Sequence, residues 1–273
     1  MVSEALHTLV AAMQYREAVA QPDLVPFVLC YWELAVPKTA EVSIEHNVFP
    51  DGCTAVLYRR SQAMPGARLR IAGPTLNSRK VPVWPGDTFW GARLQPAACE
   101  ALIGCAPSTL RDQALEASDV SSHIAARILP ELDPCASFDD AIDAYARAFR
   151  SLQRHSGEID QEIAFAARAI ARSGGMSRIS EVAAAIGIGM RQFERRFQRA
   201  VGLTPKQFAR ARRMRATAVA IARAQHVNWA ELAVEIGFAD QPHLTHEMRA
   251  VTGRSPGHFE KDVRKIKHGD LLE

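Results

Sequence analysis

The sequence lacks the features that mark membrane, zinc-binding and disulfide-rich proteins. No apolar run approaches the roughly 18 residues that suggest a membrane span. Its five cysteines are odd in number and never occur in Cys-x-x-Cys spacing, which disfavours a structural zinc site and a disulfide framework. We therefore expect reduced thiols, a cytoplasmic location, no contact with a membrane, and no metal ion or other cofactor.

Catalytic patterns are missing as well. The chain has no Ser-His-Asp or Cys-His arrangement that would support nucleophilic catalysis. A cupin-type metal site needs several His or Glu on two strands, and few histidines precede residue 156. The first 21 residues carry two glutamates and no basic start, so a helix or tail is expected there rather than a signal peptide. The sequence therefore predicts that the protein is not an enzyme.

What the sequence does have is an uneven distribution of charge. From residue 174 onward, 17 Lys and Arg stand against 10 Asp and Glu, a balance of +7. The first 173 residues carry 16 against 20, a balance of −4, so the whole chain has a net charge of +3. A basic C-terminal part joined to a mildly acidic N-terminal part indicates an anionic partner for the C-terminal part.

The N-terminal part is predicted to form short strands separated by tight turns. Runs rich in β-branched and aromatic residues alternate with Pro-Asp-Gly, Pro-Gly and Pro-Gly-Asp sequences, which are turn formers. The runs cover residues 26–36, 53–60, 67–73 and 87–94. This pattern predicts a small cupin-like β-barrel or roll within residues 20–95, with flanking helices over residues 97–160.

Helical periodicity dominates after residue 97. Residues 137–155 combine a Ser N-cap, an acidic residue three positions later and apolar residues at helical spacing. Residues 158–173 continue this character until two glycines end it. We therefore predict an α+β protein with a sensing or dimerisation domain at residues 1–160 and an all-α domain at residues 161–273.

The all-α region contains an internal repeat, at offsets of 50 and then 51 residues. At the first offset, the residues that recur are Glu181, Ala183, Ile186 and Gly187, as Glu231, Ala233, Ile236 and Gly237. At the second offset they are Gly202, Pro205 and Phe208, as Gly253, Pro256 and Phe259. The extra residue falls just after the central Gly, where a turn can absorb it.

Each copy has the plan of a helix-turn-helix. A short helix, expected at 179–185 and 229–235, ends at a Gly that supplies a left-handed C-cap. An apolar residue, Ile188 or Phe238, can fill the gap before a second helix at 190–200 or 241–251. Gly202 or Gly253 ends that second helix, and a Thr-Pro or Ser-Pro pair starts the next one.

The second helix of each copy carries side chains suited to base edges on one face. In the first copy Phe193, Phe197 and Ala200 face inward, at i, i+4 and i+7. Arg can bind guanine, Gln adenine and Glu cytosine, although a merely solvated helix face is the alternative interpretation. The candidates in the first copy are Arg191, Gln192, Glu194, Arg195, Gln198 and Arg199. The candidates in the second copy are Gln241, Pro242, His243, His246 and Arg249, with Asp240 as the expected N-cap.

A single helical pattern over residues 204–225 joins the two copies. About 20 residues at 1.5 Å each span about 30 Å, which is compatible with the roughly 34 Å between successive major grooves on one face of DNA. The pattern is rich in arginine, and the candidate phosphate contacts are Lys206, Arg212, Arg213 and Arg215.

The stretches "AAAIGIGMRQFERRFQRAVGLTP" and "EIGFADQPHLTHEMRAVTGRSPGHF" resemble the AraC/XylS family of bacterial transcription regulators, over about residues 176–264. The resemblance implies that the second helix of each unit enters the major groove of double-stranded DNA. His246 stands where the family usually has Arg, and Met248 where Phe is usual. The first copy is therefore expected to carry the larger share of specificity, and by position the resemblance implies base readers at Arg191, Glu194 and Arg195.

The N-terminal part more loosely resembles a poorly characterised domain that precedes this DNA-binding module in one branch of the family, through "EHNVFPDGCTAVLY" and "GDTFWGARLQPAA". In the wider family such domains bind effectors, and adjacent helices dimerise. The resemblance therefore leaves a small-molecule effector, a second copy of the chain and RNA polymerase as candidate partners. Candidate ligand contacts are His46, Trp32, Trp84 and Trp90, with core aromatics as the alternative interpretation.

An enzyme that uses the same DNA-binding module, such as a DNA-repair alkyltransferase, is the alternative function. It would need a reactive Cys beside Arg, His or Glu. Most of the cysteines stand in apolar surroundings, as in "VLCYW" and "IGCAP". The sequence therefore favours a sequence-specific, DNA-binding transcription regulator.

Overall fold

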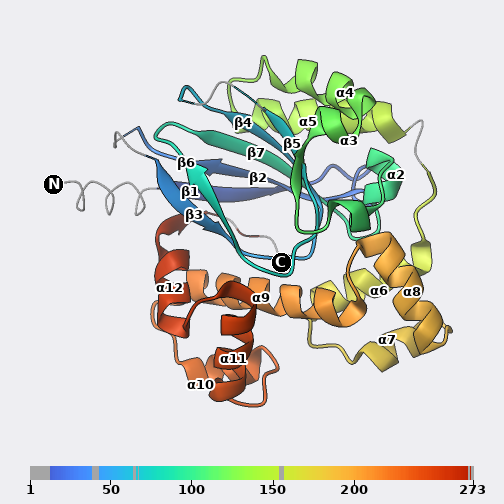
Figure 1. Cartoon of the computed structure of the whole chain (residues 1–273), viewed down its shortest axis with the longest axis vertical. Helices are drawn as coiled ribbons and strands as arrows, with labels where there is room; N and C mark the ends of the chain where they lie inside the picture. The colour runs from blue at the N-terminus through green and yellow to red at the C-terminus, as the bar shows by residue number, and fades with distance from the viewer. Residues whose placement is uncertain are drawn as a thin grey trace.

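The computed structural model describes residues 13–38, 43–63, 66, 68–153, 157–269 and 271. In Figure 1, an N-terminal part built on a β-sheet lies against a helical C-terminal part. The predicted α+β class is confirmed. Residues 1–12, part of the segment predicted as a helix or tail, lie outside the described residues.

A seven-stranded sheet forms the centre of the N-terminal part, in the order β8-β5-β4-β7-β2-β1-β9. Its strands are β1 (Met13–Val19), β2 (Val28–Ala35), β4 (Ala55–Arg60), β5 (Leu69–Ala72), β7 (Thr88–Leu94), β8 (Ala114–Glu116) and β9 (Ile266–His268). Neighbouring strands are antiparallel, except that β9 is parallel to β1. Within the described residues the two edge strands, β8 and β9, do not pair, so the sheet is not closed into a barrel.

Four of these strands, β2, β4, β5 and β7, are the ones that the sequence predicts, and β1 corrects the prediction of a helix or tail. Strand β1 pairs with β2 from Gln14 to Val19. Its alternation of buried and exposed residues places Met13 and Glu17 inside the protein. A buried glutamate interrupts the apolar alternation by which a strand is usually detected, which is why the sequence did not indicate one here.

Helices cover one face of the sheet and a two-stranded ribbon packs on the other (Figure 1). The helices are α2 (Cys99–Ile103), η1 (Pro107–Leu110), α3 (Ala117–Val120), α4 (Ser122–Leu132) and α5 (Phe138–Gln153), and the ribbon consists of β3 (Ile44–Val48) and β6 (Arg79–Val83). Helix α5 starts at the predicted cap, where the Asp140 N–H donates to Ser137 Oγ at 3.2 Å. The Tyr145 hydroxyl then ties α5 to the sheet by donating to the Trp90 carbonyl at 3.0 Å.

Seven helices make up the C-terminal part: α6 (Gln161–Arg172), α7 (Ile179–Ala185), α8 (Met190–Val201), α9 (Pro205–Arg223), α10 (Trp229–Glu235), α11 (Gln241–Thr252) and α12 (Pro256–Arg264). They form two helix pairs, α7–α8 and α10–α11, joined by α9 as the repeat predicts. Helix α6 packs with the first pair, because Ile163 and Ile170 belong to the same core as Phe193 and Phe197. None of the helices in the described part of the chain is long and apolar enough to cross a membrane.

The last strand returns the chain to the N-terminal sheet. After α12, β9 runs parallel to β1 and pairs Ile266 with Met13. The Gly269 N–H then donates to the Tyr15 carbonyl at 2.7 Å. The C-terminal part therefore contributes an edge strand to the sheet of the N-terminal part.

Candidate nucleic-acid interface

The first helix pair turns at a glycine in the left-handed region. Gly187 has a φ of 71°, a conformation that costs a residue with a Cβ atom about 1–2 kcal/mol. The Gly187 N–H donates to the Ala184 carbonyl at 3.0 Å, and the Ile188 N–H donates to the Ala183 carbonyl. These bonds end α7 and let α8 start at Met190, as the sequence predicts.

Helix α8 buries one face and exposes the other. Phe193 and Phe197 are fully buried with ring centroids 5.5 Å apart, and Phe197 lies 5.6 Å from the ring of Phe208 on α9. The predicted readers on the opposite face are all exposed: Arg191, Gln192, Glu194, Arg195, Gln198 and Arg199. Within the described residues none of these six side chains has a hydrogen bond or an ion pair, so the whole face is free to bind a partner.

One further arginine of α8 has a different role. The Arg196 guanidinium pairs with Asp160 and Glu162 at the start of α6, each at 2.6 Å. Asp160 also caps α6 by accepting from the Ile163 N–H at 3.2 Å. Arg196 therefore fixes α8 on α6 and does not belong to the exposed reading face.

The second helix pair repeats this design with other side chains. Gly237 has a φ of 78° at the turn, and Phe238 fills the gap between the helices at 4% exposure. Asp240 caps α11 as predicted, since its carboxylate accepts from the His243 N–H at 2.7 Å. The buried face consists of Leu244, Met248 and Val251, and the predicted readers Gln241, Pro242, His243, His246 and Arg249 are all exposed.

His243 has one ring nitrogen already engaged. Its Nδ1 accepts from the Ala239 N–H at 3.4 Å, and its ring meets the ring of Phe238 edge-on with centroids 5.3 Å apart. A nitrogen that accepts a hydrogen bond carries no proton, so in the neutral ring the proton is on Nε2. His243 therefore offers a hydrogen-bond donor to an acceptor on DNA.

The four predicted phosphate contacts on α9 fall into two groups. Lys206 is exposed, and Arg213 is half-buried, with its guanidinium 5.3 Å from the ring centroid of Phe238. Arg212 is 4% exposed, and the Arg215 side chain is 14% exposed and turned toward the sheet. Lys206 is therefore at the surface and Arg213 is partly so, whereas Arg212 and Arg215 lie inside the protein.

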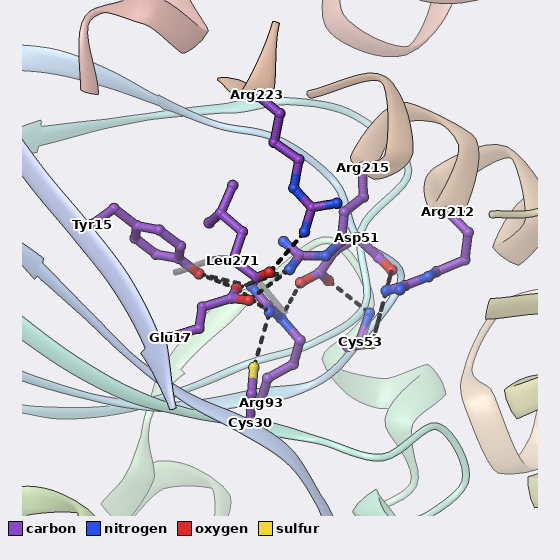
Figure 2. A network of polar contacts seen from close by, with 10 residues as sticks. All are labelled: Tyr15, Glu17, Cys30, Asp51, Cys53, Arg93, Arg212, Arg215, Arg223 and Leu271. Atoms are coloured by element: carbon purple, nitrogen blue, oxygen red, sulfur yellow. Dashed lines mark hydrogen bonds and ion pairs between the residues drawn. The ribbon is translucent and has the colours of Figure 1, made fainter. Parts of the chain in front are cut away.

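Figure 2 shows a buried network of polar contacts between the sheet and α9, which we call the seam. Glu17 on β1 is fully buried and binds Arg93 on β7 at 2.8 Å and Arg215 on α9 at 2.9 Å. Arg93 also pairs with Asp51 at 2.5 Å. Arg212 donates to the Asp51 carbonyl at 3.4 Å, so Arg212 and Arg215 are both engaged inside the protein.

The charges of the seam depend on one another. Burial alone would raise the pKa of Glu17, but Arg93 and Arg215 outweigh it and lower that pKa to about 2. Burial lowers the pKa of Arg212, whose Nε has no hydrogen-bond partner among the described residues. Because breaking a buried pair leaves an uncompensated charge, we leave Arg212 and Arg215 out of the candidate DNA surface.

The acidic residues of the seam, Glu17 and Asp51, and their partner Arg93 were not predicted from the sequence. A signal was present, since single charges such as Arg93 in "FWGARLQPAA" interrupt otherwise apolar β-rich segments. Charged residues are almost never fully buried unless they are paired. Such an interruption therefore indicates a buried ion pair, although it does not name the partner.

Two of the candidate ligand residues lie on opposite faces of the sheet. Trp90 packs in the core beneath the helices, and Trp32, on the neighbouring strand, belongs to the cluster on the opposite face of the sheet. Trp84 packs under the guanidinium of Arg59, 5.0 Å from its ring centroid. His46 lies on β3, where burial lowers its pKa to about 4. For Trp90 the arrangement agrees with the alternative interpretation, a core aromatic.

At the four buried cysteines burial dominates the pKa of the thiol, even at Cys30, whose Sγ accepts from Arg93 at 3.2 Å. Burial raises the pKa of Cys53 and Cys99 to about 12, and it also raises the pKa of Cys30 and Cys135. A thiol with a raised pKa is protonated at neutral pH and is a poor nucleophile. These four cysteines therefore give no support to an alkyltransferase.

Two families match parts of the chain. Residues 182–262 match a family described as "Helix-turn-helix domain", and residues 16–116 match one described as "Domain of unknown function (DUF6597)". Among solved structures the chain is similar to one of ToxT from Vibrio cholerae, with 9% identity over 81% of this chain and 94% of that chain, at a TM-score of 0.44. A structure of ToxT with a bound unsaturated fatty acid has 9% identity over 91% and 94%, at a TM-score of 0.41. No curated protein matches the chain.

The helix-turn-helix match covers α8 and α11 with their exposed polar faces, and it defines the class of the protein as a DNA-binding transcription regulator. The matched residues contain the two stretches that resemble the AraC/XylS family.

Proposed function

We propose that both helix pairs are helix-turn-helix units, and that α8 and α11 enter successive major grooves of one DNA site as its recognition helices. The observation that carries the proposal is the outer face of α8, where six exposed polar side chains have no partner within the described residues. The 19 residues of α9 span about 28 Å between the two units. That length is comparable to one helical turn of DNA, roughly 34 Å.

The two recognition helices are proposed to contribute unequally. On α8, Arg191 and Arg195 can each bind guanine in a bidentate manner, and Glu194 can accept from cytosine. On α11, Pro242 has no donor in its side chain, and His243 offers a single donor at Nε2. We therefore assign the larger share of base discrimination to α8.

The proposed phosphate contacts are Lys206 and Arg213 on α9, together with the basic segment over residues 261–267. Arg212 and Arg215 are not among them, because they are buried in the seam. Counter-ion release from such contacts makes binding fall steeply as salt concentration rises. A flat salt dependence would count against DNA binding altogether.

The test of this function is selection of binding sites from random DNA by the full chain, followed by titration of Arg195→Ala. The variant is expected to lose about 1–3 kcal/mol of affinity for the selected site and to relax the preference at one base pair. Arg178→Ala is the matched control, because Arg178 is exposed at the start of α7 and, among the residues that the structure describes, pairs only with the exposed Glu181. Unchanged affinity and selectivity in Arg195→Ala would refute the assignment.

The N-terminal part is proposed to regulate DNA binding by sensing a small molecule or by forming a dimer, and RNA polymerase is proposed as a partner. The N-terminal part contacts α8, α9, α11 and α12, and these contacts support a regulatory role. Sequencing of bound sites across the genome, with and without candidate metabolites, tests the sensing role. Identical site occupancy under every metabolite condition would count against it.

A further inference from the structure

One connection of the N-terminal part touches the ends of both recognition helices. Residues 73–78 join β5 to β6. A Cβ atom placed on Gly202, which ends α8, would lie 2.9 Å from Pro74 Cγ. At the other end of the connection, the Ser78 N–H donates to the carbonyl of Val251, in the last turn of α11, at 3.0 Å. The chain from Pro74 to Ser78 reaches at most about 14 Å, so the two helix ends are held close together.

Several hydrogen bonds brace the connection, and Asp112 takes part in three of them. The Asp112 N–H donates to the Pro74 carbonyl at 3.1 Å, and its carboxylate accepts from the Leu76 N–H at 3.3 Å. The Arg79 guanidinium donates to the Asp112 carbonyl. Asp112 itself has a φ of 56°, which is uncommon for a residue other than glycine. The connection is therefore held in one conformation rather than left as a loose loop.

The two helix pairs depend on such ties because they do not share a core. Phe193 and Phe197 belong to one cluster, and Leu244 and Met248 belong to another. Leu76, in the middle of the connection, packs against the cluster of the first pair. The relative placement of the pairs is therefore set by α9 and by the contacts that bridge them.

We propose that residues 73–78 set the separation of the two recognition helices, and thereby the spacing between the two half-sites that the protein accepts. The proposal rests on the function proposed above, since it presupposes that α8 and α11 read DNA. It assigns a positioning role to a part of the chain outside the DNA-binding helices. A change in the N-terminal part would reach both helices through this connection.

The magnitudes make the effect measurable. One residue extends a chain by about 3.3–3.6 Å, and one base pair extends DNA by about 3.4 Å. A base pair also turns the groove by roughly 35°, because a helical turn takes 10–10.5 base pairs. A change of one residue in this connection is therefore comparable to a change of one base pair in the spacer.

The experiment uses the full chain and DNA in which the two half-sites selected by the wild type are separated by spacers of different lengths. The test variant carries one glycine inserted between Asn77, which is exposed, and Ser78. We expect the preferred spacer to shift or broaden by at least one base pair, while the preferred half-site sequences stay the same. An unchanged spacer preference in a folded variant would overturn the proposal.

A pair of point substitutions tests the same idea without a change of length. Ser78→Pro removes the N–H that binds Val251, whereas Ser78→Ala keeps this N–H and removes only a buried hydroxyl that has no hydrogen-bond partner among the described residues. Ser78→Pro is expected to broaden the spacer preference, with Ser78→Ala behaving as the wild type. Equal preferences in both variants would contradict the proposed role.

The outcomes separate this inference from the proposed function. If the wild type selects no bipartite site, DNA reading by both pairs fails and the inference fails with it. If the wild type selects two half-sites and all variants keep one spacer, the function stands and only the positioning role is lost. Thermal unfolding of each variant shows whether a loss of binding reflects unfolding. If a variant does not fold, Asp112→Gly replaces it, because this substitution keeps the left-handed backbone and removes only the carboxylate that accepts from the Leu76 N–H. A broadened spacer preference is expected, and an unchanged one would contradict the proposal.

Discussion

The seam and the outer face of α8 are both rich in arginine, and they use it in opposite ways. In the seam, Arg93 and Arg215 are buried and paired with a fully buried Glu17. On α8, Arg191 and Arg195 are exposed and have no ion pair within the described residues. Removing one partner of a buried pair leaves the other charge buried and unpaired, so both partners are needed for stability. An exposed cation without a partner remains available to a phosphate or a base.

Basic character alone therefore does not locate a DNA-binding surface. The arginines of α9 look alike in the sequence, yet Arg212 and Arg215 serve the contact with the N-terminal part. The excess of positive charge in the C-terminal part is therefore divided between holding the two parts together and binding DNA. The following predictions test this division, from the largest effect to the smallest.

Glu17→Gln should have the largest effect, on stability. It leaves Arg93 and Arg215 buried without their shared carboxylate, and breaking a buried pair in this way costs about 3–5 kcal/mol. Chemical denaturation measures the loss. The control is Glu45→Gln, because the pair of Glu45 with Lys80 is exposed and such pairs contribute about 0–1 kcal/mol. Equal losses of unfolding free energy in Glu17→Gln and Glu45→Gln would contradict the stabilising role of the buried pair.

The pH dependence of the free energy of unfolding should reveal the contribution of the same carboxylate, that of Glu17. The pKa of Glu17 is about 2 in the folded protein and 4.5 without its partners. A lowered pKa stabilises the folded state above pH 4.5, and that contribution disappears as the pH falls from about 4.5 to about 2. The loss is on the order of 3 kcal/mol. The free energy of unfolding, measured by chemical denaturation at each pH, should depend less on pH for Glu17→Gln than for the wild type. An equal dependence in the two proteins would rule out Glu17 as its origin.

Gly202 and Gly253 occupy equivalent positions after α8 and α11, but only Gly202 is packed against the N-terminal part. Alanine at Gly253, with a φ of 66° and open space around it, should cost about 1–2 kcal/mol from backbone strain alone. Gly202 has a φ of 83°, and the Cβ atom of an alanine there would also lie 3.0 Å from the Pro107 carbonyl oxygen, so Gly202→Ala should lower the free energy of unfolding further. Thermal unfolding of the two variants compares them, and a larger loss at Gly253 would contradict the difference.

Lys206→Ala should have the smallest effect and should act on DNA alone. Removing one phosphate contact lowers the slope of log affinity against log salt by about 1 and leaves sequence preference unchanged. Arg212→Met is the control, since Arg212 is buried in the seam and should leave this slope as it is. If Arg212→Met lowered the slope as much, the seam would have to open when DNA binds.

The helices were predicted well because their signals are local. The structure places α7 and α10 at the predicted residues, and Asp240 forms the predicted cap. Gly187 and Gly237 adopt the left-handed conformation that the repeat requires. All these features depend on neighbours within about four residues, which a single sequence displays.

The strands at the edge and the seam could not be predicted in the same way. Strand β9 is short, and its partner β1 lies about 250 residues earlier in the chain. Glu17 finds Arg93 and Arg215 only when β1, β7 and α9 come together. Helical periodicity gives the angular position of Arg215 on α9, but not which side of the helix the N-terminal part covers. For the same reason, the sequence did not show that Trp32 and Trp90 lie on opposite faces of the sheet.

Because β9 pairs in parallel with β1, the C-terminal part is joined to the N-terminal part at both of its ends, by the chain at one end and by a β-sheet at the other. The first and last described strands are neighbours in one sheet, and the helices of the described residues lie between them along the chain. A cut in the backbone between α5 and α6 would leave each fragment holding one strand of the β1–β9 pair and one side of the seam. The two halves should therefore stay associated and co-purify after cleavage, so that severing the linker is not the same as releasing the DNA-binding part.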